Sequence, residues 1–429
     1  MPEQIYIDDL AEPVLSDLQK SALAYGETLD VVIKRDEILS EARSRTGLDD
    51  FGEMDFLPRL NLLCEEWDGD TGLTGIGRLS LRNKLVLFAS SRLLIEEQFK
   101  AHPEIRDEPL EAPIIVAGLP RSGTTHLLNL MAADSRLRAL PLWESYEPVA
   151  QPDEEVLKKD AECVEQSPRY KRCADSWDMM QQMTPHLAAM HPMNPDHIHE
   201  ELELMGPDFA SYNFEWLNMS PRWRDNYYAS DQTPHYQYLK KVLQLLQWQD
   251  RRAGRAKARW VLKCPQHMEQ LSVLKSVFPD ATVVLTHRDP VSVIQSSVTM
   301  LAYGQRISRH KVETKKLIDY WSDRIEHLLR ACVRDRGCLS PAQSMDVSFD
   351  VFMADDMAMV EKIYTLADLE MTDDARGELH EFIDRHPRGK HGRMVYNLRE
   401  QFGVAPAKLA QRFEFYYKRF PVKSEITHN

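Results

Sequence analysis

Residues 118–125, GLPRSGTT, have the spacing of the phosphate-binding loop G-x-x-x-x-G-K-[ST], but Thr124 stands where that motif has lysine. The apolar run at 113–117 predicts a buried strand before the loop, and residues 126–131 predict a helix after it. Such a strand, turn and helix N-terminus direct several backbone N–H groups at one point, where an anion binds. Because the missing lysine normally reaches the phosphates of ATP, the loop predicts phosphate binding without ordinary Mg-ATP chemistry, with Arg121 as its cation.

A second predicted strand, residues 281–286, also ends in polar side chains. Arg288 follows it, and Asp289 with Pro290 has the sequence of a helix start, because Asp caps helices and Pro is favoured at the first helical position. Ser296 lies further along that helix. A guanidinium binds phosphate through two hydrogen bonds, and a hydroxyl adds another donor. Arg288 and Ser296 therefore predict a second phosphate contact.

A third predicted strand, residues 260–263, ends at Lys263, and His267 follows shortly after it. Lysine and histidine at such a position can neutralise charge and move a proton. Each of the three elements also has an ordinary structural explanation. The loop could be a simple strand–helix turn, Arg288 could pair with Asp289, and His267 could make a local hydrogen bond at a helix N-terminus.

The sequence P-R-S-G-T-T after a strand resembles the loop that holds the 5′-phosphosulfate in sulfotransferases, which use 3′-phosphoadenosine 5′-phosphosulfate (PAPS) as sulfuryl donor. The lysine strand and the arginine strand follow in the order of that family. From residue 113 onward the chain is thus similar to the bacterial, carbohydrate- and lipid-like branch of the PAPS-dependent sulfotransferase family. The resemblance implies transfer of a sulfuryl group from PAPS to a hydroxyl or amine of a small-molecule, glycolipid or carbohydrate acceptor, with release of PAP.

The resemblance also assigns residues to the donor. It implies that the loop holds the 5′-phosphosulfate, that Arg288 and Ser296 hold the 3′-phosphate, and that a basic segment at 386–404 caps the cofactor. His126 stands where the soluble metabolic branch of the family has an aromatic residue that stacks on adenine. The residues implied in donor binding are Pro120, Arg121, Ser122, Gly123, Thr124, Thr125, His126, Arg288, Ser296, Arg388, Lys390 and Gly392.

Catalysis by such an enzyme needs charge stabilisation and, for a hydroxyl acceptor, a base. The resemblance implies that Arg121 and Lys263 stabilise the charge, so no metal ion is implied. Glu144, in the sequence LWE, lies in a region where several carbohydrate and bacterial sulfotransferases use a glutamate. His267 is the alternative from the metabolic branch, where the histidine is two residues after the lysine; here it is four after. We predict Glu144 as the base, with a surface or helix-capping carboxylate as its alternative role.

Residues 191–201, HPMNPDHIHEE, contain side chains that suit zinc. Two prolines and the lack of helical spacing between the histidines give no fixed ligand geometry, so we predict part of a lid instead of a metal site. Glu200 or Glu201 is a candidate for contact with the acceptor. The Met and aromatic residues between 177 and 238 suggest a partly apolar acceptor, although core packing explains such residues equally well.

The elements that must position these residues indicate an α/β fold. Predicted strands near residues 114, 261 and 283 alternate with helices, which favours a P-loop-type, doubly wound parallel sheet flanked by helices. All three motifs then lie at the carboxyl ends of strands, where ligands of such sheets bind. The predicted division is a helical N-terminal extension at 1–110, an α/β domain at 111–429 and, within it, a helical lid or acceptor-binding insertion at 143–240.

The composition limits the partners and the compartment. Of the 429 residues 28% are charged and 43% hydrophobic, as expected for a soluble globular protein. The net charge of −14 argues against nucleic acid as a partner, although a local basic pocket can still bind an anionic cofactor. Six cysteines without a C-x-x-C pair favour a reducing compartment. Without an apolar run of transmembrane length or a signal-peptide pattern, we expect a cytoplasmic protein.

Two other functions fit parts of this pattern. A P-loop kinase of small molecules would use a similar loop, but the absent lysine argues against it. A non-catalytic protein that binds PAP or another nucleotide would keep the phosphate contacts without turnover. The combination of Arg121, Lys263, Arg288 and Ser296 favours the enzyme.

Overall fold

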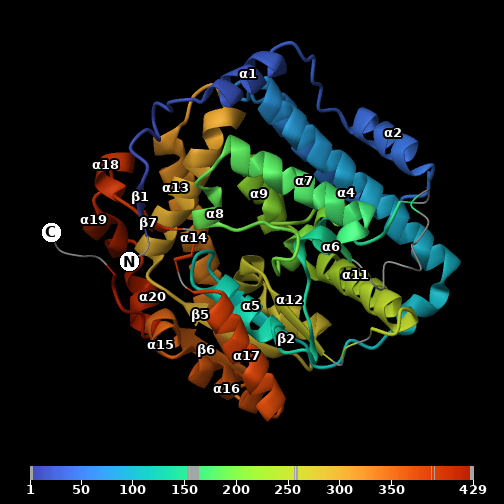
Figure 1. The fold of residues 1–429 in the computed structure, drawn as a ribbon, viewed down its shortest axis with the longest axis vertical. Coiled ribbons are helices and arrows are strands. Elements are labelled where there is room, and N and C mark those ends of the chain that lie inside the picture. Colours follow the sequence, from blue (N-terminus) through green and yellow to red (C-terminus); the bar gives the residue numbers. More distant parts are fainter. Residues whose placement is uncertain are drawn as a thin grey trace.

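A parallel five-stranded sheet lies at the centre of the molecule (Figure 1). The structure is a computed structural model that describes residues 3–151, 154, 164–255, 257, 259–387, 389–390 and 392–425. The strand order is β3–β4–β2–β5–β6, and every pairing in this sheet is parallel. The strands are β2 (Ile114–Gly118), β3 (Leu137–Arg138), β4 (Arg259–Lys263), β5 (Thr282–His287) and β6 (Ser344–Ser348). The predicted α/β fold with a parallel sheet is confirmed.

Helices cover both faces of this sheet, because successive side chains of a strand point to opposite faces. Ile115 and Ala117 of β2 enter one core, whereas Ile114 and Val116 enter another. The first core includes α11 (Thr233–Arg252), α12 (Leu271–Val277), α13 (Pro290–Ser308) and α14 (Thr314–Asp335). The second includes α5 (Thr124–Ala132), α16 (Asp356–Leu366) and α17 (Asp373–Arg385). The strand ends that carry the predicted site are therefore held by packing on two sides.

Four α-helices precede the sheet, and the last three of them share a further core with the segment that follows β3. The four are α1 (Asp17–Gly26), α2 (Arg35–Thr46), α3 (Leu57–Asp68) and α4 (Gly75–Ala101). Phe209, Phe214 and Trp223 of the later segment are buried against α2, α3 and α4. That segment contains α6 (Leu142–Tyr146), α7 (Pro168–Met183), α8 (Leu187–Met190), α9 (Asn213–Leu217) and α10 (Pro221–Ala229).

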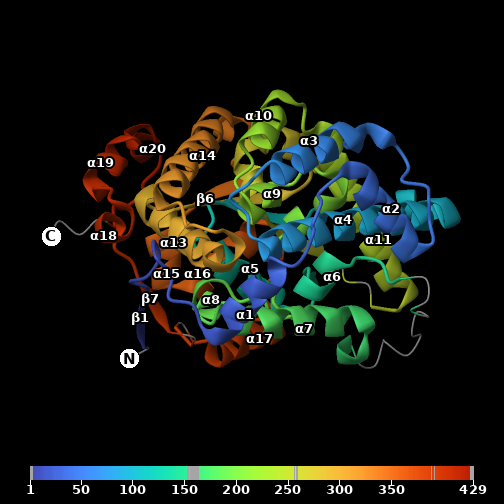
Figure 2. The ribbon, with the colours of Figure 1, turned by 90° about the horizontal axis from the view of Figure 1, so that it is seen from above.

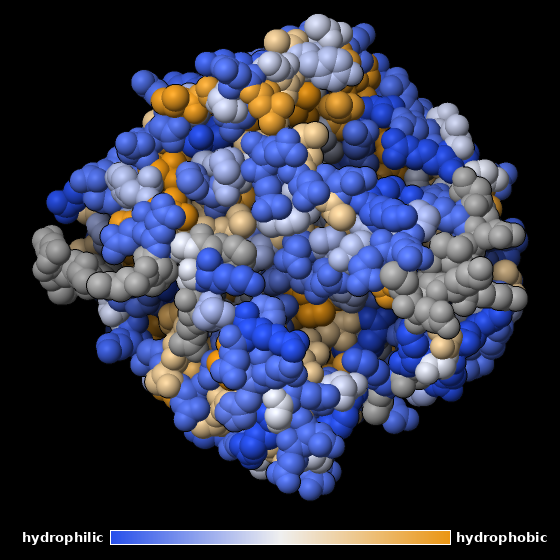
Figure 3. Space-filling view, in the orientation of Figure 1, coloured by the Kyte–Doolittle hydropathy of each residue, from blue (hydrophilic) through white to orange (hydrophobic). Residues whose placement is uncertain are grey.

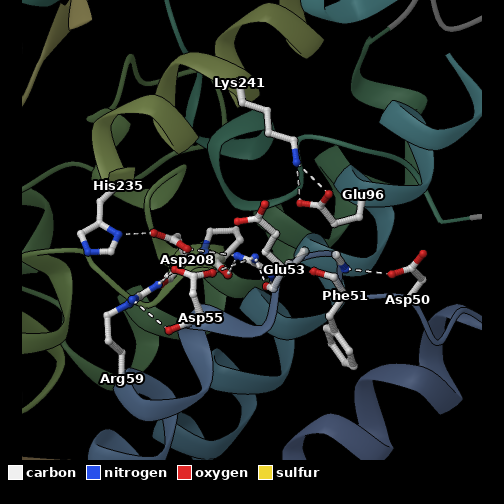
Figure 4. A network of polar contacts seen from close by, with 12 residues as sticks. Asp50, Phe51, Glu53, Asp55, Arg59, Glu96, Asp208, His235 and Lys241 are labelled. Atoms are coloured by element: carbon white, nitrogen blue, oxygen red, sulfur yellow. Dashed lines mark hydrogen bonds and ion pairs between the residues drawn. The ribbon is translucent and has the colours of Figure 1, made fainter. Parts of the chain in front are cut away.

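A buried ionic network joins the same two parts of the chain (Figure 4). Oδ1 of Asp208 accepts hydrogen bonds from Arg59 of α3 over 3.0 Å and from Arg92 of α4 over 3.1 Å. The other carboxylate oxygen contacts Nδ1 of His235 over 2.5 Å. Because a buried charge without a partner is costly, this network fixes the N-terminal helices against the segment after β3.

Both ends of the described chain lie on the same side of the molecule (Figures 1 and 2). β1 (Gln4–Tyr6) and β7 (Arg393–Val395) form a parallel two-stranded sheet there. β1 departs from the helical N-terminal extension that the sequence predicts, because its three residues are extended only through pairing with a distant strand. The remaining helices are α15 (Phe349–Ala354), α18 (Leu398–Phe402), α19 (Pro406–Gln411) and α20 (Glu414–Arg419).

The face shown in Figure 3 is mostly hydrophilic, and hydrophobic residues gather near the end where α1 lies. The exposed apolar residues in and next to α1 are Val14, Leu18 and Tyr25. None of the helices within the described part of the chain is long and apolar enough to span a bilayer.

Candidate active site

The loop between β2 and α5 is shaped by unusual backbone angles and by the close approach of Gly118 to Thr286 of β5. Arg121 has φ of 65° and Gly123 has φ of 82°, and the left-handed conformation strains a residue other than glycine. A Cβ on Gly118 would lie 1.9 Å from Oγ1 of Thr286, which leaves room for glycine alone. The hydroxyl of Ser122 contacts the same Thr286 oxygen over 2.9 Å. Among the described side chains none caps the start of α5, so the first N–H groups of this helix fit an anion.

Side chains from three elements meet beside this loop. Nε of Arg121 donates to Oγ of Ser296 over 3.0 Å, and the Arg288 guanidinium donates to the backbone carbonyl of Arg121. Ser296 in turn donates to the hydroxyl of Tyr396 over 2.9 Å. The structure thus brings Arg121, Arg288 and Ser296 together, as expected for ends of neighbouring strands. It adds Tyr396, which lies in the predicted capping segment at 386–404 but was not among the predicted donor-binding residues.

Arg288 holds a carboxylate side-on. Its Nε and one terminal nitrogen donate to the two oxygens of Glu425 over 2.7 and 2.8 Å, while the guanidinium lies 4.0 Å from the centre of the Phe349 ring. The N–H of Glu425 donates to Asp289 over 2.7 Å. A phosphate presents its oxygens to arginine in the same way, so the guanidinium is already oriented for an oxyanion. Sequence reasoning missed Glu425 because no local pattern marks a contact between such distant segments.

Lys263 ends β4 next to the loop, since its strand neighbour is Val116 of β2. Its side chain is 2% exposed, and its ammonium contacts a carboxylate oxygen of Glu200 and lies 3.4 Å from Oγ1 of Thr125. Burial raises the pKa of Glu200 more than the positive charge of Lys263 lowers it. A carboxylate with a raised pKa binds a proton more readily, which suits a base that faces a cavity.

The two bases predicted from the sequence lie within packed protein. Nε2 of His267 contacts Glu201 over 2.6 Å and Nδ1 contacts the hydroxyl of Tyr236 over 2.9 Å, with the ring buried. Glu144 is 7% exposed and pairs with Arg138 over 2.7 Å. Glu200 lines the cavity next to the loop. Neither Glu144 nor His267 is among the described residues of that lining.

That cavity has a volume of about 610 Å³ and begins at the loop residues Pro120, Arg121, Thr124 and Thr125. Its walls come from α4, α7, α9 and α13 and from residues between 187 and 203. The cavity therefore adjoins the loop on one side and the segment after β3 on the other, where an acceptor could reach a group held by the loop.

Three histidines lie together in this region. The ring centres of His191 and His199 are 5.8 Å apart, and those of His191 and His197 are 6.2 Å apart. Burial lowers the pKa of all three rings, that of His197 to about 4, so they are neutral at pH 7. His191 and His199 line the cavity. Nowhere in the described ranges do three His, Cys, Asp or Glu side chains form a group suited to a metal ion.

The predicted cofactor-capping segment is only partly described. Arg388 lies outside the described residues, Lys390 is exposed, and Gly392 has φ of 93° in the turn before β7. His126 contacts Asp356 over 3.0 Å, and its ring centre is 5.6 Å from that of Phe352. A second cavity, of about 340 Å³, is lined by His126 and by residues of α15, α16, α17 and the segment after α17.

The chain is similar to known sulfotransferases in sequence and in structure. A profile described as the sulfotransferase family matches residues 113–373. Sulfotransferase STF1 from Mycobacterium tuberculosis H37Rv is 27% identical, with a TM-score of 0.77 over 90% of this chain and 100% of that one. Sulfotransferase STF9 from Mycobacterium avium is 24% identical, with a TM-score of 0.80 over 93% of this chain and 100% of that one, and shares the fold. No curated protein matches this sequence.

Proposed function

Because this chain belongs to the sulfotransferase family, we propose that it transfers a sulfuryl group from PAPS to a hydroxyl or amine of a small-molecule, lipid or carbohydrate acceptor and releases PAP. One observation carries the proposal. In the described structure the loop leads into α5, whose start has no side-chain cap, and Arg121 of the loop contacts both Arg288 and Ser296. Two neighbouring anion-binding positions suit a donor that has a phosphosulfate and a separate 3′-phosphate.

The residues present fit this donor. The side-on carboxylate of Glu425 stands in for phosphate oxygens on Arg288, and the start of α5 offers N–H groups to the 5′ end. The cavity beside His126 is the place where the family resemblance implies adenine. When bound, PAPS supplies the sulfuryl group, whose S–O bond to the 5′-phosphate breaks as an S–O bond to the acceptor forms.

Arg121 and Lys263 supply positive charge on two sides of the loop. Together with the N–H groups of α5, they stabilise negative charge that develops there, because fixed donors in a site with little water need no reorganisation. These groups make the proposed reaction independent of a metal ion. Activity should therefore persist when the enzyme is assayed in EDTA.

We assign the base to Glu200. It lines the cavity, its pKa is raised by burial, and it contacts Lys263 beside the loop. In this role Glu200 takes the proton of the acceptor hydroxyl, and Lys263 is left free to contact the group held by the loop. Glu144 and His267 lack that access, since their polar atoms contact Arg138, Glu201 and Tyr236.

The test is incubation of the purified protein with ³⁵S-labelled PAPS and a metabolite extract of its host, followed by identification of the labelled product. Parallel reactions with γ-³²P-labelled ATP test the kinase alternative, which Thr124 in the lysine position disfavours. Calorimetry with PAP tests the binding-protein alternative. Tight PAP binding with no labelled product would favour that alternative over the enzyme.

A further inference from the structure

The cavity beside the loop has a largely apolar wall. Its volume of about 610 Å³ lies in the range that encloses one small molecule. Met300 and Leu301 belong to α13, the helix that carries Ser296, so one helix connects the phosphate contact with this wall. Further apolar residues come from α4, α7 and α9: Leu87, Met180, Trp216 and Leu217.

Apart from Arg121, the cations of the described wall are each paired with a carboxylate. The pairs are Lys84–Glu203 (2.8 Å), Arg172–Glu147 (2.6 Å) and Lys263–Glu200. Arg121, a further cation of the described lining, donates to Ser296 on the donor side. His191 and His199 carry no charge at pH 7, because burial lowers their pKa.

Because Arg121 is assigned to the proposed donor, a charged acceptor would have to separate one of these ion pairs and leave a buried charge without its partner. Ser80, Asn83, Ser176 and Asn213 offer hydrogen bonds at parts of the wall, but a sugar would still place several hydroxyl groups against the methionine, leucine and tryptophan side chains and lose their hydrogen bonds to water. An apolar molecule meets neither penalty, because it covers the wall and leaves every pair intact.

On the basis of the sulfotransferase function proposed above, we propose that the acceptor is an uncharged, predominantly apolar alcohol that lies between α4, α7, α9 and α13 with its hydroxyl at Glu200. In this reaction the acceptor oxygen forms a bond to sulfur, and the sulfur–oxygen bond to the 5′-phosphate breaks. The electron pair of the broken bond leaves with PAP, and the hydroxyl proton goes to the Glu200 carboxylate. No other reactant is needed.

The first experiment compares three probes: decan-1-ol, 2-naphthol and methyl glucoside. Binding of each to the PAP-loaded protein is measured by calorimetry, and transfer is measured with ³⁵S-labelled PAPS. We expect the two apolar alcohols to bind at least about tenfold more tightly than methyl glucoside, since buried hydroxyls without partners weaken binding. Tighter binding of the glucoside would overturn the proposal.

The second experiment uses two adjacent methionines of α7. Met180 lines the cavity, whereas Met179 is 55% exposed and serves as the matched control. Met180→Gln places an amide in the apolar wall and should weaken binding of decan-1-ol about tenfold, with PAP affinity unchanged. Met179→Gln should leave both affinities unchanged. Equal effects of the two substitutions, or no effect of Met180→Gln, would contradict this site for the acceptor.

The two readouts separate this inference from the function on which it rests. Binding of decan-1-ol that depends on Met180, without transfer of label to any alcohol, would uphold the apolar site and overturn the sulfotransferase function. Transfer of label to methyl glucoside but not to either apolar alcohol would uphold the sulfotransferase function and overturn the apolar acceptor.

Discussion

At the scale of single residues, the contact between Lys263 and Glu200 joins the β2–α5 loop to the cavity that we propose for the acceptor. The backbone of Lys263 is held by β4 and by a hydrogen bond from its N–H to Glu201 over 2.8 Å. Its side chain is buried against Glu200 and Thr125, so the ammonium has little freedom to leave the loop. Glu200 faces the cavity. A proton that Glu200 accepts weakens its attraction to Lys263, which frees the lysine to neutralise charge at the loop. In the proposed reaction, proton transfer and charge stabilisation are thereby coupled through one ion pair.

Glu200→Gln should lower the turnover rate by roughly a hundredfold or more, because the amide cannot accept the acceptor proton. PAP affinity should barely change, since the carboxylate faces the acceptor. Burial raises the pKa of Glu200, so the wild-type rate should fall as pH drops through that raised pKa and protonates the base. The acidic limb of the pH–rate profile should disappear in the variant.

Glu144→Gln and His267→Asn are the matched comparisons for that measurement. Both side chains are held by other groups in the described structure, Glu144 by Arg138 and His267 by Glu201 and Tyr236. Their substitution should lower the melting temperature, whereas the turnover rate per folded molecule should stay nearly unchanged. A dead but well-folded Glu144→Gln that binds PAP, beside an active Glu200→Gln, would restore the base predicted from the sequence.

Arg288→Lys tests the second phosphate position. Lysine keeps the positive charge but loses the two-point contact that Arg288 makes with the Glu425 carboxylate. PAP affinity measured by calorimetry should fall roughly tenfold or more, whereas AMP, which lacks the 3′-phosphate, should bind as before. A loss that is equal for PAP and AMP would mean that Arg288 does not read the 3′-phosphate.

At the scale of secondary-structure elements, the turn from β2 into α5 depends on close packing against β5. Gly118→Ala would place a Cβ 1.9 Å from the Thr286 hydroxyl, so the loop or the strand must shift. We expect a loss of about 1–3 kcal/mol in unfolding free energy and weaker PAP binding. Gly377→Ala is the control, because this glycine lies in α17 with open space around it and the change should stabilise the helix by about 0.5–1 kcal/mol. Chemical denaturation measures both changes.

The same elements explain how much the sequence could predict. β2, β4 and β5 are marked by local apolar runs, and the polar residues at their ends follow at once, so local patterns suffice to assign Arg121, Lys263 and Arg288 to one sheet edge. Neither Glu144 nor Glu200 has a local sequence pattern that marks it as facing a cavity. Glu144 pairs with Arg138, which lies only six residues earlier, whereas Glu200 reaches the cavity beside Lys263, a partner far away in the sequence.

At the scale of the whole molecule, the proposed donor and acceptor sides of the site draw mostly on different parts of the fold. The proposed donor side is built on the sheet edge, α5 and α13, whereas α4, α7 and α9, together with the far part of α13, supply much of the proposed acceptor wall. The segment predicted as a lid shares a core with the N-terminal helices and is joined to them through Asp208. The parts of the proposed acceptor wall that come from α4 and α9 are therefore anchored to a buried core.

The C-terminal segment adjoins the proposed donor side, because Glu425 covers the guanidinium of Arg288. If Arg288 binds the 3′-phosphate as we propose, that phosphate must displace this carboxylate, and a partly exposed ion pair is worth up to about 1 kcal/mol. Glu425→Gln should therefore tighten PAP binding about two- to fivefold and leave AMP binding unchanged. Glu414→Gln, which removes an exposed carboxylate that pairs with Lys418 on α20, should change neither affinity. Weaker PAP binding in Glu425→Gln would instead mean that the carboxylate helps to hold Arg288 in position for the phosphate, and the sign of the change decides between the two roles.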